Sequence, residues 1–457
     1  MRKLYRALPT VLFLVWSVLI ATGLLAATLR QGIVPVDYQA YQRAAAALAR
    51  GASPYQTPAQ SLAIWRSYHR LDVSLRAAHM RNTSRRVSPS GPLARMQPGP
   101  YLYLPTLALL VRQLHLTAAP WEVLDLACIV GFPLLLIRWA RVSWWWLLLV
   151  AGSWDVWSTY TGGNVEAMLL FATLVVARLL WPPRPLGRAA VPLAAVLVAF
   201  VLLAKPFYAL FFVAFGVILL LADGESRRAT LRALGAVAGL TALLLAGEVI
   251  RWGPALRGDA LRYLAHTLDA QWFVLPVAAQ TPMSAWNRTP LQALIALGLP
   301  AAPAQFVAGV VWLAALAASA WLVRGRRLSF AQAFAVAFAL LYLGHPVGWT
   351  LVYLDLVVCV AAWPALPRVG RAALLGGVLA LLASHWAALV LTGLGDGLPL
   401  LTLQPADRPW ETWIVLPLAW ALTTWAVRPS NARRIASIVN PPMGCSTRPD
   451  RRIRSRR

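Results

Sequence analysis

"LPTVLFLVWSVLIATGLLAATL" (residues 8–29) and, just after it, "GIVPVDYQAYQRAAAALARGASPY" (residues 32–55) are the two stretches that decide the fold. The first stretch has no charged residue over 22 positions, which is long enough for a helix across a lipid bilayer. In the second, Pro35 ends the apolar run and Asp37 follows two residues later. Acidic residues are scarce in this chain, 16 against 42 basic ones. The pattern predicts a membrane span that is followed at once by a rare carboxylate.

The composition of the whole chain is that of a multispanning membrane protein. It has 457 residues, of which 59% are hydrophobic and only 13% are charged. Several further runs of 17 or more residues have few or no charges, which is typical of transmembrane helices. The run at residues 8–29 is longer than the apolar part of a signal peptide and no small-x-small cleavage site follows it. We therefore expect an all-α, multi-pass protein of the plasma (inner) membrane.

The net charge of +26 does not indicate a nucleic-acid-binding protein. Much of the excess lies in short arginine-bearing loops between apolar runs and in the C-terminal tail, as the positive-inside rule expects of cytoplasmic segments. Cys128, Cys359 and Cys445 form no close-spaced pair, so neither a disulfide framework nor a zinc site is predicted.

The arginine-bearing loops give a topology when the chain is followed back from its basic tail, residues 428–457. Loops 182–188, 223–232, 324–327 and 364–371 then all fall on the cytoplasmic side. The spans that this implies are 164–181, 189–204, 206–222, 231–250, 304–323, 329–343, 347–363, 371–393 and 411–427.

Between Asp37 and Asn164 the number of crossings must be even, but three apolar stretches compete there. These are residues 101–117, 121–139 and 142–158. Either the first or the third does not fully cross, and the sequence leaves this choice open. The total is roughly eleven to thirteen spans.

We interpret residues 1–427 as one transmembrane domain with two outer loops, 30–100 and 251–303. In the first loop Tyr38, Tyr41, Ala45 and Leu48 recur at helical spacing, which predicts an amphipathic helix lying on the membrane surface. The Arg-, Ser- and Pro-rich residues 65–100 are predicted to form a partly disordered loop, and the basic tail is predicted to be disordered. The role of the inserted-looking 64–98 segment is left open by the sequence.

Two charged residues at the outer face have both a structural and a functional interpretation. Asp37 suits the N-cap of the surface helix, or it is a catalytic carboxylate at the membrane boundary. Lys205 ends the 189–204 span and, besides Lys3, is the only lysine in the chain. It either extends its amine from the end of the span to the interface or contacts a phosphate.

Further polar residues of the outer face complete the candidate site. Asn164, in Gly162-Gly163-Asn164 with Glu166, either caps the next span or adds an anion-binding helix start. Asn287, which follows Trp286, and His345 with Trp349 are predicted on the same side. A site there suits an amphiphile whose tail lies in lipid and whose phosphate lies at the interface.

The order of these motifs resembles glycosyltransferase family 87, the polyprenyl-phosphate-mannose-dependent mannosyltransferases of the GT-C superfamily. The matching stretches, spread over nearly the whole chain, are "VDYQAYQRAAAALARGASPY" (36–55), "YLYLPTLALL" (101–110), "GGNVEAMLL" (162–170), "KPFYALFF" (205–212), "WNRTPLQALI" (286–295) and "HPVGWTLVYLDLVV" (345–358). Two departures stand out: the family often has Gly-Gln-x-Asn where this chain has Gly162-Gly163-Asn164, and it tends to place a His after, not before, the residue matching Trp349.

The resemblance implies a GT-C-like bundle with an extracytoplasmic active site and a sugar donor carried on a lipid monophosphate. Asp37 would be the general base and Lys205 would bind the donor phosphate. Tyr38, Asn164, Asn287, His345 and Trp349 are the other predicted substrate-binding residues. Mannose is the sugar that the resemblance implies, and the acceptor would be a hydroxyl of a glycolipid or glycan in the cell envelope.

Two functions from different classes remain open. The first is an inverting hexosyltransferase, for which we predict no metal or other cofactor, because no Asp-x-Asp stands in the sequence and basic partners suffice for a monophosphate leaving group. The second is a transporter or flippase of a lipid-linked substrate. Transporters keep ionisable residues inside the membrane, and here Glu248 and Asp355 are the candidates.

Overall fold

The computed structural model describes residues 2–30, 36–56, 60, 103–181, 189–222, 227–268, 289–345, 352–391 and 415–427. Every regular element in these ranges is a helix, which confirms the all-α prediction. The N-terminal half contains α1 (Arg2–Arg30), α2 (Val36–Ala49), α4 (Pro105–Gln113), α5 (Ala118–Ala140), the 3₁₀ turn η2 (Trp144–Trp146), α6 (Leu147–Gly152), α7 (Trp154–Gly162), α8 (Glu166–Leu180), α9 (Ala190–Ala204), η3 (Pro206–Tyr208) and α10 (Ala209–Leu221). The C-terminal half contains α11 (Arg227–Arg251), α12 (Gly253–Leu268), α15 (Pro290–Ala296), α16 (Ala301–Val323), α17 (Phe330–Gly344), α18 (Leu354–Ala362), η4 (Trp363–Ala365), α19 (Arg368–Leu391) and α20 (Leu416–Ala426).

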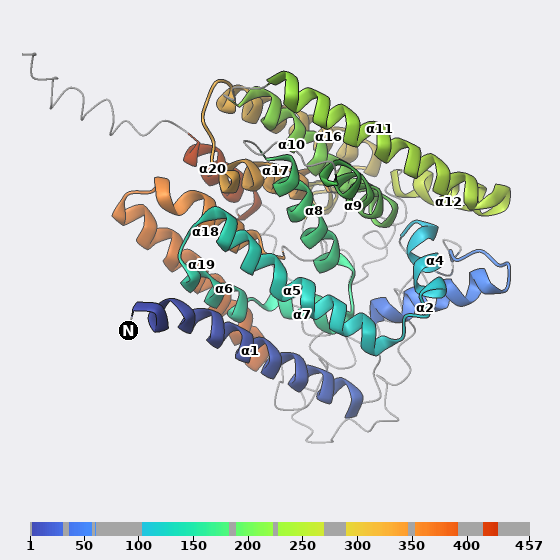
Figure 1. Cartoon of the computed structure of the whole chain (residues 1–457), viewed down its shortest axis with the longest axis horizontal. Coiled ribbons are helices and arrows are strands. Elements are labelled where there is room, and N and C mark those ends of the chain that lie inside the picture. Colours follow the sequence, from blue (N-terminus) through green and yellow to red (C-terminus); the bar gives the residue numbers. More distant parts are fainter. Residues whose placement is uncertain are drawn as a thin grey trace, which may run out of the picture.

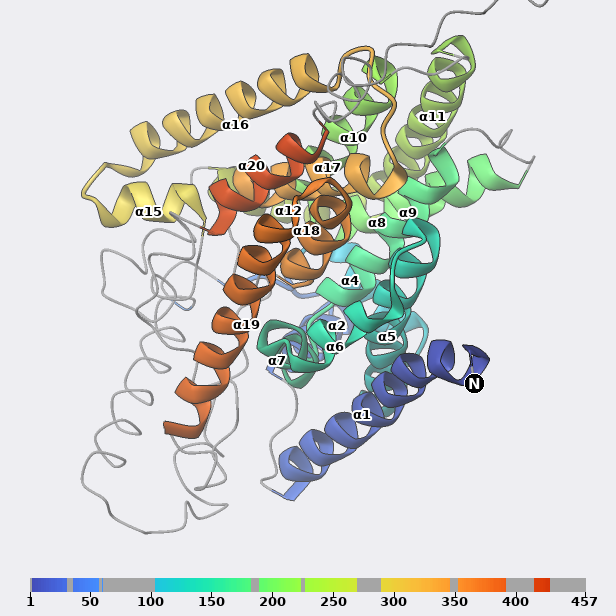
Figure 2. The same cartoon turned by 90° about the vertical axis from the view of Figure 1, so that its left-hand side faces the viewer.

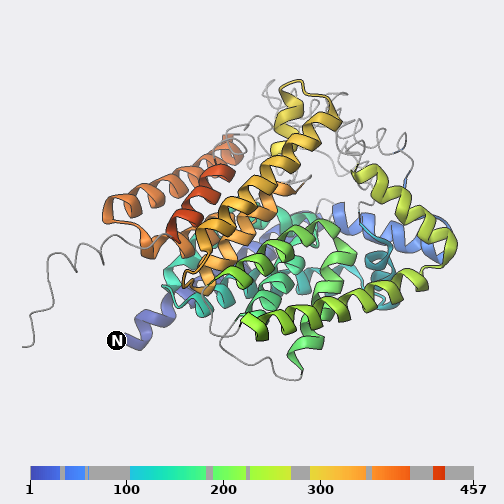
Figure 3. The same ribbon diagram turned by 90° about the horizontal axis from the view of Figure 1, so that it is seen from above.

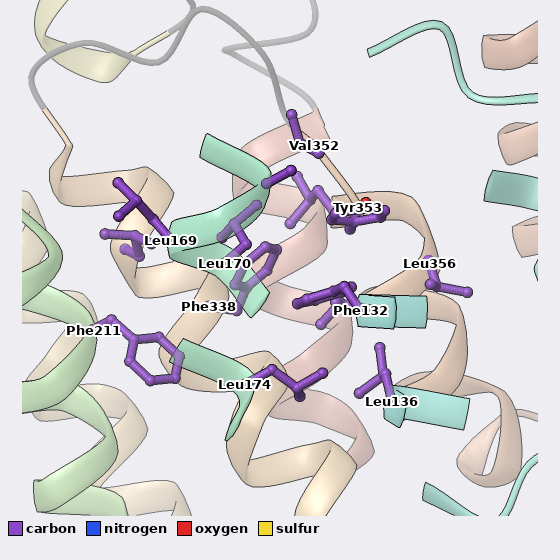
Figure 4. Close-up of a cluster of buried hydrophobic side chains, with 14 of the residues drawn as sticks. Phe132, Leu136, Leu169, Leu170, Leu174, Phe211, Phe338, Val352, Tyr353 and Leu356 are labelled. Carbon is purple, nitrogen blue, oxygen red and sulfur yellow. The ribbon is translucent and has the colours of Figure 1, made fainter. Parts of the chain in front are cut away.

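The helices agree with the predicted apolar runs to within a few residues, except that α18 begins later than expected. They form one bundle in which α8, α10 and α17 lie at the centre (Figure 1). Their facing side chains make a core of aliphatic and aromatic residues, in which Phe132 stacks on Tyr353 and Phe211 lies against Phe334. Figure 4 shows part of this layer, to which α8 contributes Leu169, Leu170 and Leu174, α5 contributes Phe132 and Leu136, and α17 contributes Phe338.

The ends of the helices gather at two opposite ends of the bundle. At one of them, which we call the arginine end, Gly325 donates its backbone N–H to Leu221 O at 3.0 Å and Arg326 donates to Val427 O at 3.2 Å. The ring of Trp181 lies 5.9 Å from that of Phe330. These residues adjoin three of the loops that the sequence analysis assigns to one side and the start of the tail, so the described ends of those segments lie at the same end of the bundle.

Three helices are long and apolar enough to cross a membrane, counting the described residues only: 118–140, 227–251 and 302–323. Two of these, α11 and α16, lie on the outside of the bundle (Figure 2) and expose large apolar side chains, among them Leu243, Phe306 and Trp321. Contiguous apolar surface of this kind is rare on water-soluble monomers. The structure is therefore compatible with a membrane protein.

The helices in the two stretches left open by the sequence, residues 101–117 and 142–158, follow different paths through the bundle. The helix in the first stretch, α4, has nine residues and is about 14 Å long at 1.5 Å per residue, far short of a bilayer. α5 leads away from α4, and η2, α6 and α7 lead back, because Trp121 Nε1 in the first turn of α5 donates to Gly163 O after α7 at 2.9 Å. The return path is thus the 142–158 stretch, and α4 stays at one end.

The predicted amphipathic helix after the first span is α2, and its apolar face is covered by protein. Tyr38 and Tyr41 are fully buried, and both rings lie within 5.5 Å of the Trp121 ring, measured between centroids. Figure 1 shows α2 and α4 side by side at the end of α5. α12 turns back at the end of α11 (Figure 3) and packs Ala260 and Tyr263 against Leu104 and Tyr55. The helical spacing was predicted correctly, but its partner is this assembly of short helices instead of lipid alone.

Candidate functional site

Asp37 is the second residue of α2, and its carboxylate contacts the turn between α7 and α8. Its Oδ2 accepts a hydrogen bond of 2.8 Å from Nδ2 of Asn164, 127 residues further along the chain. Asp37 therefore lies inside the first turn, two residues beyond the N-cap position that was considered for it. Burial raises the pKa of Asp37 to about 6, while the Asn164 hydrogen bond and the charge of Lys205 act in the opposite direction. A carboxyl with this pKa is ionised at neutral pH and still basic enough to accept a proton.

Asn164 is held in one orientation by the turn between α7 and α8. Gly163 has a φ of +62°, the left-handed conformation that ends a helix and that favours glycine. The next residue, Asn164, accepts the backbone N–H of Glu166 on its Oδ1 at 2.9 Å. A backbone N–H can only donate, so the amide oxygen must face Glu166 and the amide nitrogen must face Asp37. The N-cap of α8 is Val165, so Asn164 lies one residue before the position predicted for it, and it links the turn to Asp37.

Lys205 turns inward to a carboxylate instead of extending to the surface. It is the residue that ends α9, and its Nζ forms an ion pair with Glu166 Oε2. The two side chains are only 19% and 12% exposed. The other oxygen of Glu166 accepts a hydrogen bond of 2.6 Å from the hydroxyl of Tyr208 in η3. Asp37, Asn164, Glu166, Lys205 and Tyr208 form what we call the polar network.

Two buried tyrosines fix the height of α2 against this network. The hydroxyl of Tyr41 donates to that of Tyr103 at 3.0 Å and accepts the backbone N–H of Val165 at 3.3 Å. The Lys205 amine lies 5.6 Å from the centre of the Tyr103 ring, within reach of a cation–π contact. Burial raises the pKa of both tyrosines well above the usual range, so both remain neutral hydrogen-bonding groups.

The other predicted site residues have different positions. His345, which follows α17, is buried, its ring lies 5.3 Å from that of Phe207, and it lies within electrostatic reach of Glu166, so it borders the polar network. Tyr38 is not part of it: its hydroxyl donates to Leu116 O at 2.6 Å and accepts from Gln42, which fixes α2 to the α4–α5 connection. Asn287 and Trp349 lie outside the described residues.

Four residues that matter at this end were not predicted as site residues. Glu166 and Tyr208 follow Asn164 and Lys205 at short spacing, which is the signal that could have revealed them. Glu122 and Asp125 lie three residues apart in the apolar run of α5, hence on one face of the helix. Asp125 is 0% exposed and, among the described residues, neither of its oxygens has a hydrogen-bond partner. The negative charges of Glu122 and Asp37 both act on it.

The chain was compared with models of protein families, with curated proteins and with solved structures. No family model, no curated protein and no solved structure matches it. Interpretation of the site therefore depends on its own geometry.

That geometry brings a base, a hydrogen-bond donor and a cation to one end of the bundle. Among the described residues no group of three or more His, Cys, Asp or Glu side chains has the arrangement of a metal site. The chemistry available to the polar network itself is proton acceptance at Asp37 and stabilisation of an anion at Lys205.

Proposed function

We propose that this protein is a membrane glycosyltransferase that uses a polyprenyl-phosphate sugar, with mannose as the first candidate, on the extracytoplasmic face. The acceptor is a hydroxyl of a glycolipid or glycan. The observation that carries this proposal is the connection of Asp37 to Lys205 through Asn164 and Glu166. A proton acceptor and a phosphate partner are the two groups that transfer from a lipid phosphate needs.

In the proposed reaction the acceptor oxygen attacks the anomeric carbon from the side opposite the phosphate, and the configuration inverts. A new carbon–oxygen bond forms as the bond from the anomeric carbon to the phosphate oxygen breaks. The electron pair of that bond leaves with the polyprenyl phosphate, whose charge Lys205 stabilises. The proton of the acceptor hydroxyl passes to Asp37. General-base help of this kind contributes roughly 10²–10⁴-fold in rate.

The polyprenyl tail explains why the base lies directly after α1. The tail cannot leave the lipid, so the phosphate and the sugar are confined to the interface. The contacts of Tyr41 and Tyr103 hold Asp37 at the level where α8 begins and α9 ends. In the predicted topology this level is the outer interface.

The experiment is sugar transfer from a radiolabelled polyprenyl-phosphate sugar by purified protein in nanodiscs, with wild type compared with Asp37→Asn. Asn keeps the size of the side chain and its helix-start preference but cannot accept the proton. We expect Asp37→Asn to bind donor normally and to lose at least about 100-fold in kcat. Glu248→Gln is the control, since Glu248 bonds to Thr106 and Arg251 outside the polar network. Transfer by Asp37→Asn at the wild-type rate would exclude Asp37 as the base.

A transporter or flippase of a lipid-linked substrate is the second candidate, and the buried carboxyl groups of α5 favour it. Transporters retain such groups inside the bundle as proton or ion sites. Movement of a labelled polyprenyl-phosphate sugar across liposomes, abolished by Asp125→Leu and without any glycosylated product, would support transport and contradict the transferase.

A further inference from the structure

The Lys205 amine is already paired with the carboxylate of Glu166, which opposes the binding of a second anion such as a phosphate. The ion pair with Glu166 is mostly shielded from water, and a partly buried pair of this kind is weakly screened. A second anion cannot simply be added at Lys205, since the phosphate and Glu166 would then lie beside each other. The phosphate and Glu166 therefore compete for the amine.

The surroundings of Glu166 suit this exchange. Its backbone N–H is engaged by Asn164 and stays so whatever the side chain does. Its second carboxylate oxygen is held by the Tyr208 hydroxyl, and His345 lies within its electrostatic reach. Glu166 can therefore give up Lys205 without becoming an isolated charge. The start of α8, which positions Asn164 and through it Asp37, is not disturbed.

We propose that Glu166 is a positioning residue that serves as the resident counter-ion of Lys205 and competes with the phosphate of the incoming lipid. When the site is empty, Glu166 keeps the amine neutralised and aimed at the network. When the lipid monophosphate binds, it takes over the amine and Glu166 stays on Tyr208. Competition of this kind weakens phosphate binding, which also allows the polyprenyl phosphate product to leave. The inference rests on the proposed function only for the identity of the phosphate ligand.

The test is a double-mutant cycle on phosphate binding, with no turnover required. The dissociation constant for a polyprenyl monophosphate in nanodiscs is measured by titration calorimetry for wild type, Glu166→Gln, Lys205→Met and the double variant. Gln keeps hydrogen bonds to Tyr208 and Lys205 but carries no charge. We expect Glu166→Gln to bind roughly tenfold to a hundredfold more tightly, the usual contribution of one charge-assisted contact. Lys205→Met should weaken binding, and the double variant should bind no more tightly than Lys205→Met alone.

Two further measurements separate the explanations. Glu248→Gln removes a carboxylate charge from another ion pair and should leave affinity unchanged. If Glu166→Gln does not fold, Tyr208→Phe takes its place. Without the Tyr208 hydroxyl, Glu166 has no donor to stay on when it leaves Lys205, so it competes more strongly and weaker phosphate binding is expected. Inorganic phosphate, titrated without lipid, should show the same order of variants at weaker affinity.

Unchanged or weaker binding by Glu166→Gln would overturn the competition. An equal gain in the Lys205→Met background would overturn it too, since the gain would then come from general charge and not from release of the amine. If the cycle behaves as expected but no variant transfers sugar, the exchange at Lys205 stands and the transferase proposal falls. If sugar is transferred but the cycle shows no coupling between Glu166 and Lys205, the transferase proposal stands and the exchange at Lys205 falls.

Discussion

Two sets of carboxyl groups lie at the same end of this bundle and are treated in opposite ways. Asp37 and Glu166 each have partners that account for their charge: an amide, a tyrosine hydroxyl and the Lys205 amine. Glu122 receives one hydrogen bond, from Tyr160, and Asp125 has none among the described residues. The charges of the first set are compensated by hydrogen bonds and an ion pair. Burial of the second set without such partners lowers the free energy of unfolding of the surrounding core. The contrast separates groups placed for chemistry from groups that are buried without compensation.

The largest effect that would sharpen this contrast is the pH dependence of activity. The pKa of Asp37 is about 6, so kcat/KM should fall about tenfold per pH unit below that value, as the base is protonated. At pH 4 the loss should be roughly 100-fold. Initial rates with the polyprenyl-phosphate sugar between pH 4 and 8 measure it. A flat profile through this range would show that Asp37 is not the titrating base.

The stability of the protein should respond to the same group with a defined sign. The pKa of Asp37 in the folded protein is raised from 3.8 to about 6, so between these values the folded state binds more protons than the unfolded state. Ionisation of Asp37 therefore lowers the free energy of unfolding as the pH rises through this window, and the loss is complete above about pH 6. Asp37→Asn cannot ionise and so does not lose this stability. The difference in thermal midpoint, variant minus wild type, should therefore be larger at pH 7 than at pH 4.

The next largest effect concerns Asn164, which links the two charged parts of the polar network. Asn164→Leu removes the amide donor that lowers the pKa of Asp37 and the acceptor for the Glu166 N–H. The acid limb of the pH–rate profile should therefore move to higher pH, with about a tenfold loss of kcat/KM at neutral pH. Asn164→Asp is the matched variant. It restores the acceptor for the Glu166 N–H but places a second carboxylate beside Asp37, so the acid limb of its pH–rate profile should move to still higher pH than that of Asn164→Leu. An unshifted limb in both would contradict the contact.

A smaller effect in the opposite direction is expected at the unpaired carboxyl group of α5. Asp125→Leu replaces a buried polar group by an apolar one and should raise the free energy of unfolding by about 1–3 kcal/mol. Glu122→Leu should gain less, because it also breaks the hydrogen bond to Tyr160. Thermal unfolding in detergent measures both. Loss of activity by a stable Asp125→Leu protein would contradict the contrast between the two sets of carboxyl groups, because it would show that Asp125 also has a functional role.

The smallest effect is expected at Tyr38, which was predicted to bind substrate and which the structure ties to Leu116 instead. Tyr38→Phe should lower the free energy of unfolding by about 1–2 kcal/mol, the value of one buried hydrogen bond left with an unpaired carbonyl. KM for donor and acceptor should be unchanged. A raised KM at normal stability would return Tyr38 to the binding site.

The helices and most of their bounds could be predicted from the sequence because apolar runs and arginine-bearing loops depend on composition over many residues. The candidate residues Asp37, Asn164 and Lys205 could be singled out one by one, but their partners could not. The bond from Asp37 to Asn164 joins positions 127 residues apart, and no local pattern encodes it. Glu166 was visible in the sequence, yet only the structure shows that it pairs with Lys205. The buried face of α2 was predicted, but its protein partners were not, because periodicity shows which side is apolar and not what covers it.

The bond between Trp121 and the carbonyl of Gly163 has a consequence for biogenesis. It closes a segment of 42 residues in which only α5 is long and apolar enough to enter a bilayer unaided. The return path is broken into η2, α6 and α7, and Ser153 interrupts it between two short helices. Such pieces are poor insertion signals alone. In the proposed membrane orientation we expect α5 and its return path to enter the bilayer together, as a hairpin, and the polar network to assemble only after the last residue of that hairpin has been released.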